Sequence, residues 1–365
     1  MTRLGDMVPA SANGLVKQYA RAARFVPCNL FFTIRTPIIE QMQMLQCIPL
    51  ALTLQTRAPS GNLFYKRKSV TDSSQSAPGS QNWKLTLAYD GTDFSGWQVQ
   101  PGAPTIQGQL QMALRRVASE SPLPQGSGRT DAGVHALGQV ASFHLQARIP
   151  PKNLLRALNR TLPPSIRVLE SRTVPSTFHA RHSALAKTYE YRVFRQPICP
   201  PSLARYVHTC PWPLDVETLQ ESAQFFVGKH DFLSFAATDP DLAIRNSLAE
   251  SAPNLGHAPG PNAPVGAIRT IFASTWEAQH TDSGSLLLYR VRGSGFLHHM
   301  VRNLVGTMLD VGRGHLLLSE IPSIIAARSR SAAGPTAPAQ GLFLHSVEYP
   351  PFEEPPSFPG LDTEA

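Results

Sequence analysis

Residues 126–135 read GSGRTDAGVH, and this stretch decides how the rest of the chain is interpreted. Glycines at positions 126, 128 and 133 allow positive φ and let another molecule approach the backbone closely. Asp131 stands two residues after Arg129, and a nearby cation favours the charged form of a carboxylate. An ionised carboxylate on a Gly-rich loop suits a nucleophile or base better than a general acid. A structural turn with an Arg–Asp pair would give the same pattern, so both interpretations stay open here.

Strand and helix patterns alternate on both sides of this loop. Residues 83–89 alternate between large apolar and polar or small side chains, which is typical of a strand. Thr105 is placed to cap a helix that carries Ile106, Leu110 and Leu114 on one side. Further strands are predicted at 139–145, 166–174, 187–195, 268–278, 285–293 and 342–349, and further helices at 151–161, 215–227 and 297–311, with a short one from 319.

This interleaving with short connections favours an α+β fold over a doubly wound parallel sheet. We expect an N-terminal half at 81–180 with the Asp131 loop, a C-terminal half at 181–350 that completes a cleft, and a tail at 351–365. Residues 1–80 show no sustained helix or strand period and end in a Ser-rich stretch typical of a linker. They are a disordered extension, a targeting segment or the product of a start placed too far upstream, and these three readings stay open.

Composition excludes several classes of protein. The chain has 365 residues, 42% of them hydrophobic, and no uninterrupted apolar run of the roughly 18 residues that a membrane span needs. The four cysteines show neither a Cys-x-x-Cys pair nor zinc-site spacing: Cys28, Cys47, Cys199 and Cys210. We therefore expect idle thiols in a reducing compartment and a cytoplasmic protein, while organelle targeting by residues 1–80 stays open.

The net charge of +8 is unevenly distributed. Residues 1–80 carry nine Lys and Arg against three acids, and the remaining residues carry 24 against 22. Between positions 148 and 195, however, ten basic residues face only Glu170 and Glu190. Such a stretch can follow the phosphates of a nucleic acid, although a solvated surface explains the charge equally well.

Two further places contain residues suited to chemistry. Tyr189 lies on an alternating strand, where a half-buried aromatic side chain is the simpler explanation. The same explanation is favoured for Tyr191. The predicted helix at 297–311 includes His298 and His299. Adjacent residues of a helix point about 100° apart, so this pair would make poor joint metal ligands, and we expect no metal site.

The stretch from Gly128 to His135 resembles the signature GRTDAGVH of the TruA family of tRNA pseudouridine synthases, with eight consecutive matches. The resemblance covers essentially all of residues 83–349. Five other motifs support it: YDGTDFSGWQ at 89–98, FHAR at 178–181, KTYEY at 187–191, HDFLSF at 230–235 and FLHHMVRN at 296–303. Because these motifs occur in order and at compatible spacing, the resemblance is far more specific than a single loop would be.

The resemblance implies the pseudouridine synthase fold, an α+β protein with a largely antiparallel central sheet in two related halves and a cleft across it. It implies an isomerase that converts uridine to pseudouridine in tRNA, usually in the anticodon stem-loop at positions 38–40, and that often works as a homodimer. The reaction involves no redox change, so no cofactor is expected. Asp131 matches the catalytic aspartate, Tyr189 the tyrosine against the target uracil, and Arg302 the arginine that pairs with the aspartate. Arg129 is similar to a residue associated with tRNA engagement, but a plain counter-ion role is as well supported.

Departures from the family pattern concern residues 1–80, a Pro/Gly/Asn-rich insertion at 251–266 and the Ala-Ala-Thr after Phe235, where an arginine is common. Two other functions compete with the isomerase. A non-catalytic RNA-binding protein would not need Asp131, Tyr189 and Arg302 together. A glycosidase-like hydrolase would need a second carboxylate, and no partner stands near Asp131 in the sequence.

Overall fold

The computed structural model describes residues 79–237, 266–281 and 284–352. The extension at 1–80, the insertion at 251–266 and the tail at 351–365 lie outside these ranges except for their boundary residues. Cys28 and Cys47 also lie outside them. Within the described ranges, none of the helices is long and apolar enough to cross a membrane.

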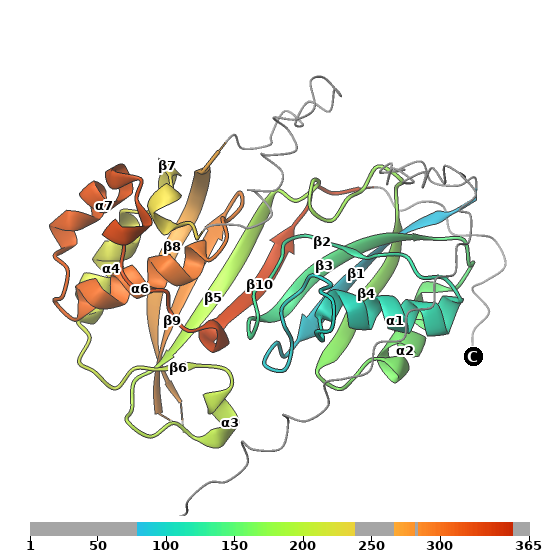
Figure 1. The fold of residues 1–365 in the computed structure, drawn as a ribbon, viewed down its shortest axis with the longest axis horizontal. Helices are drawn as coiled ribbons and strands as arrows, with labels where there is room; N and C mark the ends of the chain where they lie inside the picture. Colours follow the sequence, from blue (N-terminus) through green and yellow to red (C-terminus); the bar gives the residue numbers. More distant parts are fainter. Residues whose placement is uncertain (1–78, 238–265, 282–283, 353–365) are drawn as a thin grey trace, which may run out of the picture. The chain divides into compact units, whose positions relative to one another are not determined.

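One sheet of ten strands organises the fold (Figure 1). Its strands are β1 (Gln81–Tyr89), β2 (Gln125–Gly126), β3 (His135–Leu145), β4 (Ile166–Val174), β5 (Ala186–Phe194), β6 (His208–Thr209), β7 (Gly228–Asp231), β8 (Ile268–Thr281), β9 (Gly284–Gly293) and β10 (Leu342–Glu348). Their order is β4-β1-β3-β10-β5-β9-β8-β7, with β2 paired to β3 and β6 to β5. Only β3–β10 and β5–β6 pair in parallel. The expected α+β fold with a largely antiparallel sheet is confirmed.

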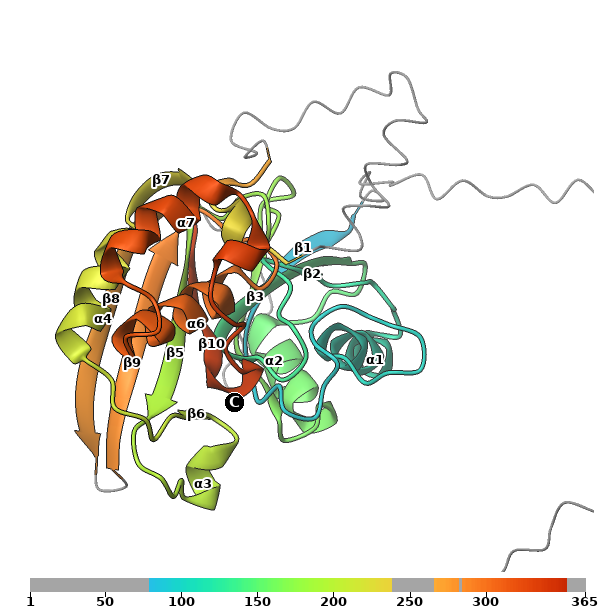
Figure 2. The ribbon, with the colours of Figure 1, turned by 60° about the vertical axis from the view of Figure 1, so that its left-hand side comes forward.

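Helices lie beside both ends of the sheet (Figures 1 and 2). They are α1 (Ile106–Ala118), α2 (Pro151–Thr161), α3 (Pro201–Ala204), α4 (Val216–Gln224), α6 (Met300–Gly312) and α7 (Ile321–Ala327), with short 3-10 turns at Leu233–Phe235, Leu318–Glu320, Arg330–Ala332 and Ala339–Gly341. Helices α1 and α2 lie beside β1 and β4, whereas α4, α6 and α7 lie beside β7 to β9. Both sequence halves thus contribute strands to one sheet and helices that lie beside it.

The residues that form the core explain why these elements appear where they do. On β1, Trp83, Leu85 and Leu87 are fully buried, as strand alternation predicts. Helix α1 begins after Thr105, whose hydroxyl accepts a hydrogen bond from the Gly108 amide, so the expected cap is present. Strand β3 is longer than predicted because Ala136 already pairs with β1 and β10.

Strand β5 buries both of its faces rather than one. Tyr191 is fully buried, and its hydroxyl donates to the Pro338 carbonyl at 2.9 Å. On the opposite face Glu190 is also buried, which a charge tolerates only with partners. Arg192 and Arg290 supply them at 2.8 and 2.9 Å. Hydrogen bonds and charges from these arginines hold the pKa of Glu190 below its usual value.

Helix α6 is joined tightly to the segment that leads into β10. Asn303 is fully buried; its amide donates to the Phe235 carbonyl, and its side-chain oxygen accepts from Thr336 at 2.6 Å. Thr307 accepts from the Gly334 amide at 2.9 Å. At Gly306 an added Cβ would lie 1.7 Å from the Pro335 carbonyl oxygen. The close approach of backbone to helix therefore requires glycine at this position.

Gly306→Ala should destabilise the protein by at least about 2 kcal/mol, since the new methyl group meets rigid backbone and the helix must shift. Gly312→Ala, in the same helix, is the control: its Cβ would come within 2.9 Å of the buried Leu219 side chain, which has to shift, but it meets no backbone atom. Because alanine favours a helix over glycine by about 1 kcal/mol, part of this overpacking cost is offset, and the loss should be smaller than at Gly306. Urea unfolding of both variants measures the difference. Equal losses would contradict the steric account.

Lys187 is a half-buried cation whose lowered pKa should be visible in the pH dependence of the stability of the fold. Its ammonium group donates to the Ser127 carbonyl, next to the Asp131 loop. Burial, assisted by Arg181 and Arg269, lowers its pKa from 10.5 to about 8. Between these values the unfolded chain binds the proton that the folded chain has released. The contribution of Lys187 to folding stability therefore rises with pH across this window.

The unfolding free energy of the wild type, minus that of Lys187→Met, should thus increase from pH 8 to pH 10 by up to about 1 kcal/mol per pH unit. Urea unfolding at several pH values measures it, and taking the difference cancels the buried tyrosines, which titrate in both proteins. Lys229→Met removes an exposed lysine of β7 and serves as the control. If the wild-type and Lys187→Met values stay parallel, the lowered pKa is wrong.

Candidate active site

The loop between β2 and β3 places Asp131 in a tight turn. The Val134 amide donates to the Asp131 carbonyl at 3.1 Å, and Gly133 adopts a φ of +76° inside this turn. Positive φ at this point strongly favours glycine. The glycine that the sequence singles out therefore has a defined structural role.

Four hydrogen bonds hold the residues of this loop that precede Asp131. The Tyr89 hydroxyl shares a hydrogen bond of 2.8 Å with Thr130. The Gln139 amide donates to the Gly128 carbonyl at 2.8 Å, and the Trp97 amide donates to the Thr130 carbonyl at 3.0 Å. Lys187 adds the contact to Ser127. Motif 89–98 and strand β5 thus position the catalytic candidate without touching its carboxylate.

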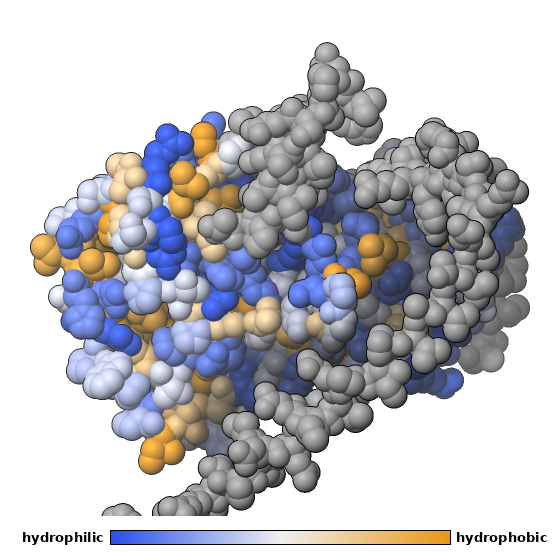
Figure 3. All heavy atoms as spheres, viewed as in Figure 1, coloured by the Kyte–Doolittle hydropathy of each residue, from blue (hydrophilic) through white to orange (hydrophobic). Residues whose placement is uncertain are grey.

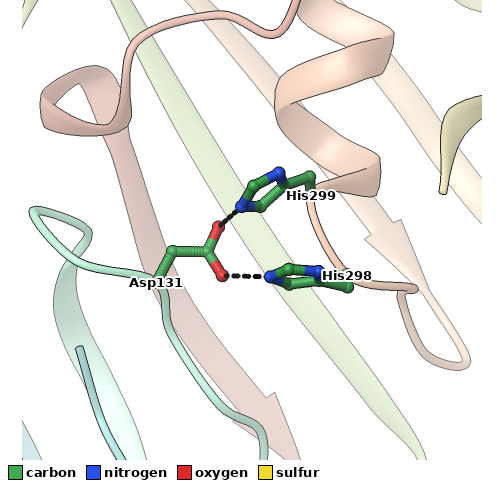
Figure 4. A group of neighbouring side chains, drawn as sticks. All are labelled: Asp131, His298 and His299. Atoms are coloured by element: carbon green, nitrogen blue, oxygen red, sulfur yellow. Dashed lines mark ion pairs between the residues drawn. The ribbon is translucent and has the colours of Figure 1, made fainter. Parts of the chain in front are cut away.

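Three basic side chains meet the Asp131 carboxylate. Arg302 of α6 places Nη1 3.3 Å from Oδ2, and its Nε donates to the Ala337 carbonyl at 2.7 Å. His299 places Nε2 3.3 Å from Oδ2, while His298 places Nε2 3.5 Å from Oδ1 (Figure 4). Asp131 itself remains partly accessible, with 22% of its side chain exposed. The carboxylate therefore faces three basic side chains and remains partly accessible to a ligand.

The prediction that a helix includes both histidines is wrong. Helix α6 begins at Met300, and His299 precedes it with a φ of 58° in the left-handed region. The two rings consequently stack with centroids 4.0 Å apart instead of diverging (Figure 4). Their contact with Asp131 was missed because neither glycine nor asparagine marks the left-handed residue.

The prediction of no joint metal site assumed that His298 and His299 both lie on a helix, and they do not. Ligand atoms of Asp131, His298 and His299 all lie within 4.8 Å of one another, and these residue types suit a transition metal. Arg302, however, already places a permanent positive charge 3.3 Å from one of the carboxylate oxygens. A metal ion there would be repelled by this guanidinium, so we interpret the group as an ion-pair cluster.

Tyr189 lies beside this cluster on β5. Only 8% of it is exposed, and its ring meets Phe296 edge to face at 5.0 Å. Its hydroxyl is 3.9 Å from the point where a Gly128 Cβ would stand, so it borders the loop. Burial, with smaller effects of Tyr89 and Asp131, raises the pKa of Tyr189 well above its usual value. The hydroxyl therefore stays protonated and can donate a hydrogen bond but not accept a proton.

The remaining predicted site residue, Arg129, has an exposed side chain at the edge of the same loop. Within the described ranges, the charged groups recorded against Asp131 come from α6 and the two residues before it. Arg302 is thus a counter-ion of Asp131, and the role of Arg129 stays a prediction. Lys187 belongs to the basic stretch and to the motif at 187–191, but its contact with the Ser127 carbonyl could not be predicted, because nothing in the strand pattern marks it.

Comparisons with known proteins agree with this arrangement. A family model described as tRNA pseudouridine synthase matches residues 86–183 and 257–350. The tRNA pseudouridine synthase A of Solibacter usitatus is 47% identical over 267 residues, which cover 73% of this chain and 98% of that protein. The enzyme of the same name from Moorella thermoacetica is 42% identical over 268 residues, covering 73% and 98%.

A third relative, tRNA pseudouridine synthase A 1 of Desulfotalea psychrophila, is 40% identical over 269 residues, covering 74% of this chain and all of that protein. The matched region of the family model contains Asp131 in its first segment and Arg302 in its second. The two residues that meet at the candidate site thus both lie within the matched segments. The chain belongs to the tRNA pseudouridine synthase family, a family of isomerases.

Proposed function

We propose that this chain converts uridine to pseudouridine in the anticodon stem-loop of tRNA, at positions 38–40, with Asp131 as the catalytic carboxylate. The observation that carries the proposal is the partly open Asp131 carboxylate held against Arg302 on a rigid Gly-rich loop. The family match supports the reaction type. Resemblance to the TruA signature supports the target region.

The proposed reaction breaks the C1′–N1 bond of the uridine, turns the base and joins C1′ to C5, while the C5 proton is lost and N1 gains one. All atoms of the base are retained, so no cofactor is needed. Asp131 either adds to C1′ or removes the C2′ proton to form a glycal, and both routes start from the ionised carboxylate. Arg302 places a fixed positive charge 3.3 Å from this carboxylate.

Tyr189 and Arg129 are proposed to hold the nucleotide. The base must leave its stack before chemistry, and the Tyr189 ring offers a surface against which it can rest. Burial raises the pKa of Tyr189, so its hydroxyl is protonated before the substrate binds and can donate a hydrogen bond to uracil. Arg129 is exposed on the same loop, where a guanidinium can reach a phosphate.

The basic stretch between 148 and 195 is proposed to contribute to the tRNA-binding surface through α2. On this helix Leu154 and Leu158 are fully buried, whereas Lys152, Arg156 and Arg160 are exposed at spacings of four residues. These three cations therefore form one ridge. The face of the molecule in Figure 3 mixes hydrophilic and hydrophobic side chains without one continuous apolar area, which suits a polar ligand.

The two competing functions receive less support. A non-catalytic RNA-binding protein does not need an aspartate that three basic groups surround. A glycosidase-like hydrolase needs a second carboxylate, whereas the side chains that contact Asp131 in the described part of the chain are Arg302, His298 and His299. A homodimer is also proposed, on the family resemblance alone. Sedimentation that gives about twice the chain mass of 39.8 kDa would support it, and a monomer at assay concentration would exclude it.

Asp131→Asn should abolish pseudouridine formation, with a rate loss of about three orders of magnitude or more, because the amide can neither attack C1′ nor take a proton. The measurement is pseudouridine mapping in unmodified tRNA transcripts without added cofactor, with tRNA binding measured alongside. The wild type should modify an anticodon-arm uridine, and the variant should bind tRNA normally. A wild type that binds tRNA but modifies nothing would favour the non-catalytic protein, and release of free uracil would favour the hydrolase.

Arg156→Glu with Arg160→Glu should weaken tRNA binding at low salt and flatten the dependence of log Kd on log salt concentration by up to about 2. The turnover rate at saturating tRNA should change less than about twofold, since these residues are proposed to bind only phosphates. The control is Arg115→Glu with Arg116→Glu, which reverses the same charge on the exposed side of α1. Equal effects of the two pairs would show that net charge matters and that α2 is not a binding ridge.

A further inference from the structure

The turn before α6 places a non-glycine residue where glycine is preferred. The Met300 amide donates to the Leu297 carbonyl at 3.1 Å and closes a turn whose third residue, His299, takes a positive φ. Among the residues that the structure describes, three non-glycine residues have positive φ: Ser119, His299 and Arg328. Ser119 and Arg328 follow the last residues of α1 and α7, where the left-handed conformation is ordinary. His299 instead stands at the start of α6, where an extended conformation is usual.

His299 does not justify this conformation as a helix cap, because its side chain makes no capping hydrogen bond. A left-handed residue other than glycine costs about 1–2 kcal/mol. Glycine would adopt the same backbone without strain, so the cost points to a use for the imidazole ring. Strained backbone of this kind collects at functional sites.

The effect of the conformation is to aim two rings at one carboxylate. In a continuous helix, His298 and His299 would point about 100° apart. Here they stack at 4.0 Å, and each Nε2 faces a different oxygen of Asp131, at 3.5 and 3.3 Å (Figure 4). A carboxylate contacted at both oxygens from one side can rotate little about its side-chain bonds.

We propose that His298 and His299 are positioning residues that fix the orientation of the Asp131 carboxylate before the substrate binds, an inference that rests on the proposed function. Arg302 supplies charge to Oδ2, and the two imidazoles set the plane of the group. The reacting oxygen is then presented at a constant angle to the ribose. A misplacement of about 1 Å can cost about 10²-fold in rate. Faster catalysis is therefore a reason to keep a strained residue at this position.

The charge state of His299 agrees with this division of roles. Burial lowers its pKa, and the neighbouring His298, Arg302 and Arg330 lower it further, whereas Asp131 raises it. A neutral His299 contacts the carboxylate through Nε2 at 3.3 Å without adding a second full charge. Arg302 remains the permanent cation of the cluster.

His299→Gly separates the ring from the backbone, because glycine keeps the left-handed conformation and removes only the imidazole. The variant should be as stable as the wild type or more so, bind tRNA with unchanged Kd and KM, and lose about 10²-fold in kcat. His299→Asn should recover part of that loss, since asparagine tolerates positive φ and its amide can donate to Oδ2. Ser119→Gly is the control: it relieves the same strain at α1 and should leave kcat unchanged.

Histidine ring NMR tests the contact without using activity. In Asp131→Asn the pKa of His299 should fall, because Asp131 raises it and the asparagine carries no charge. If the pKa falls while the wild type makes no pseudouridine, the contact stands and the proposed function fails. If the pKa is unmoved, or His299→Gly keeps full kcat, the positioning role is overturned. It is also overturned if a chelator abolishes wild-type activity and zinc restores it, since the histidines would then be metal ligands.

Discussion

The contact between Asp131 and Arg302 is the constraint on which the rest of the structure depends. It joins a loop of the first sequence half to a helix of the second, across 171 positions of the chain. Two hydrogen bonds hold Arg302 in place. Its Nε donates to the Ala337 carbonyl at 2.7 Å, and its own carbonyl accepts from the Ala337 amide. The pairing therefore requires that α6, the segment around Ala337 and the Asp131 loop all be correctly placed at once.

Strand β10 meets much of that requirement. It is the last strand of the chain, yet it lies between β3 of the first half and β5 of the second. Its parallel pairing with β3 extends over only Phe343 and Leu344, whereas its antiparallel pairing with β5 is long. The two halves are thus joined through a short seam beside the active loop. The segment that enters β10 also packs on Gly306 and Asn303, so a change at either residue would be transmitted to Arg302.

Much of this arrangement could be predicted from the sequence, and what escaped did so for physical reasons. Alternation marks β1 and β5 as strands, so both strands and the cap at Thr105 are predicted correctly, although β5 is buried on both faces. The start of α6 is not predicted correctly, because helical periodicity continues through His298 and His299 and no local residue type signals the left-handed turn. The contact of Lys187 was not predicted because it depends on the folded Asp131 loop, where its partner Ser127 lies 60 positions away in sequence. Tertiary contacts override local preference at both places.

Both of these failures lie next to Asp131, and this coincidence has a physical cause. A strained His299 and a half-buried Lys187 each lower the stability of the folded chain, the first by backbone conformation and the second by removing a charge from water. A sequence selected for stability alone would place glycine at the first position and an apolar residue at the second. The large core around Trp83, Tyr191 and Tyr289 lets the fold tolerate these costs. Local sequence rules fail where chemistry, rather than folding, determines the residue.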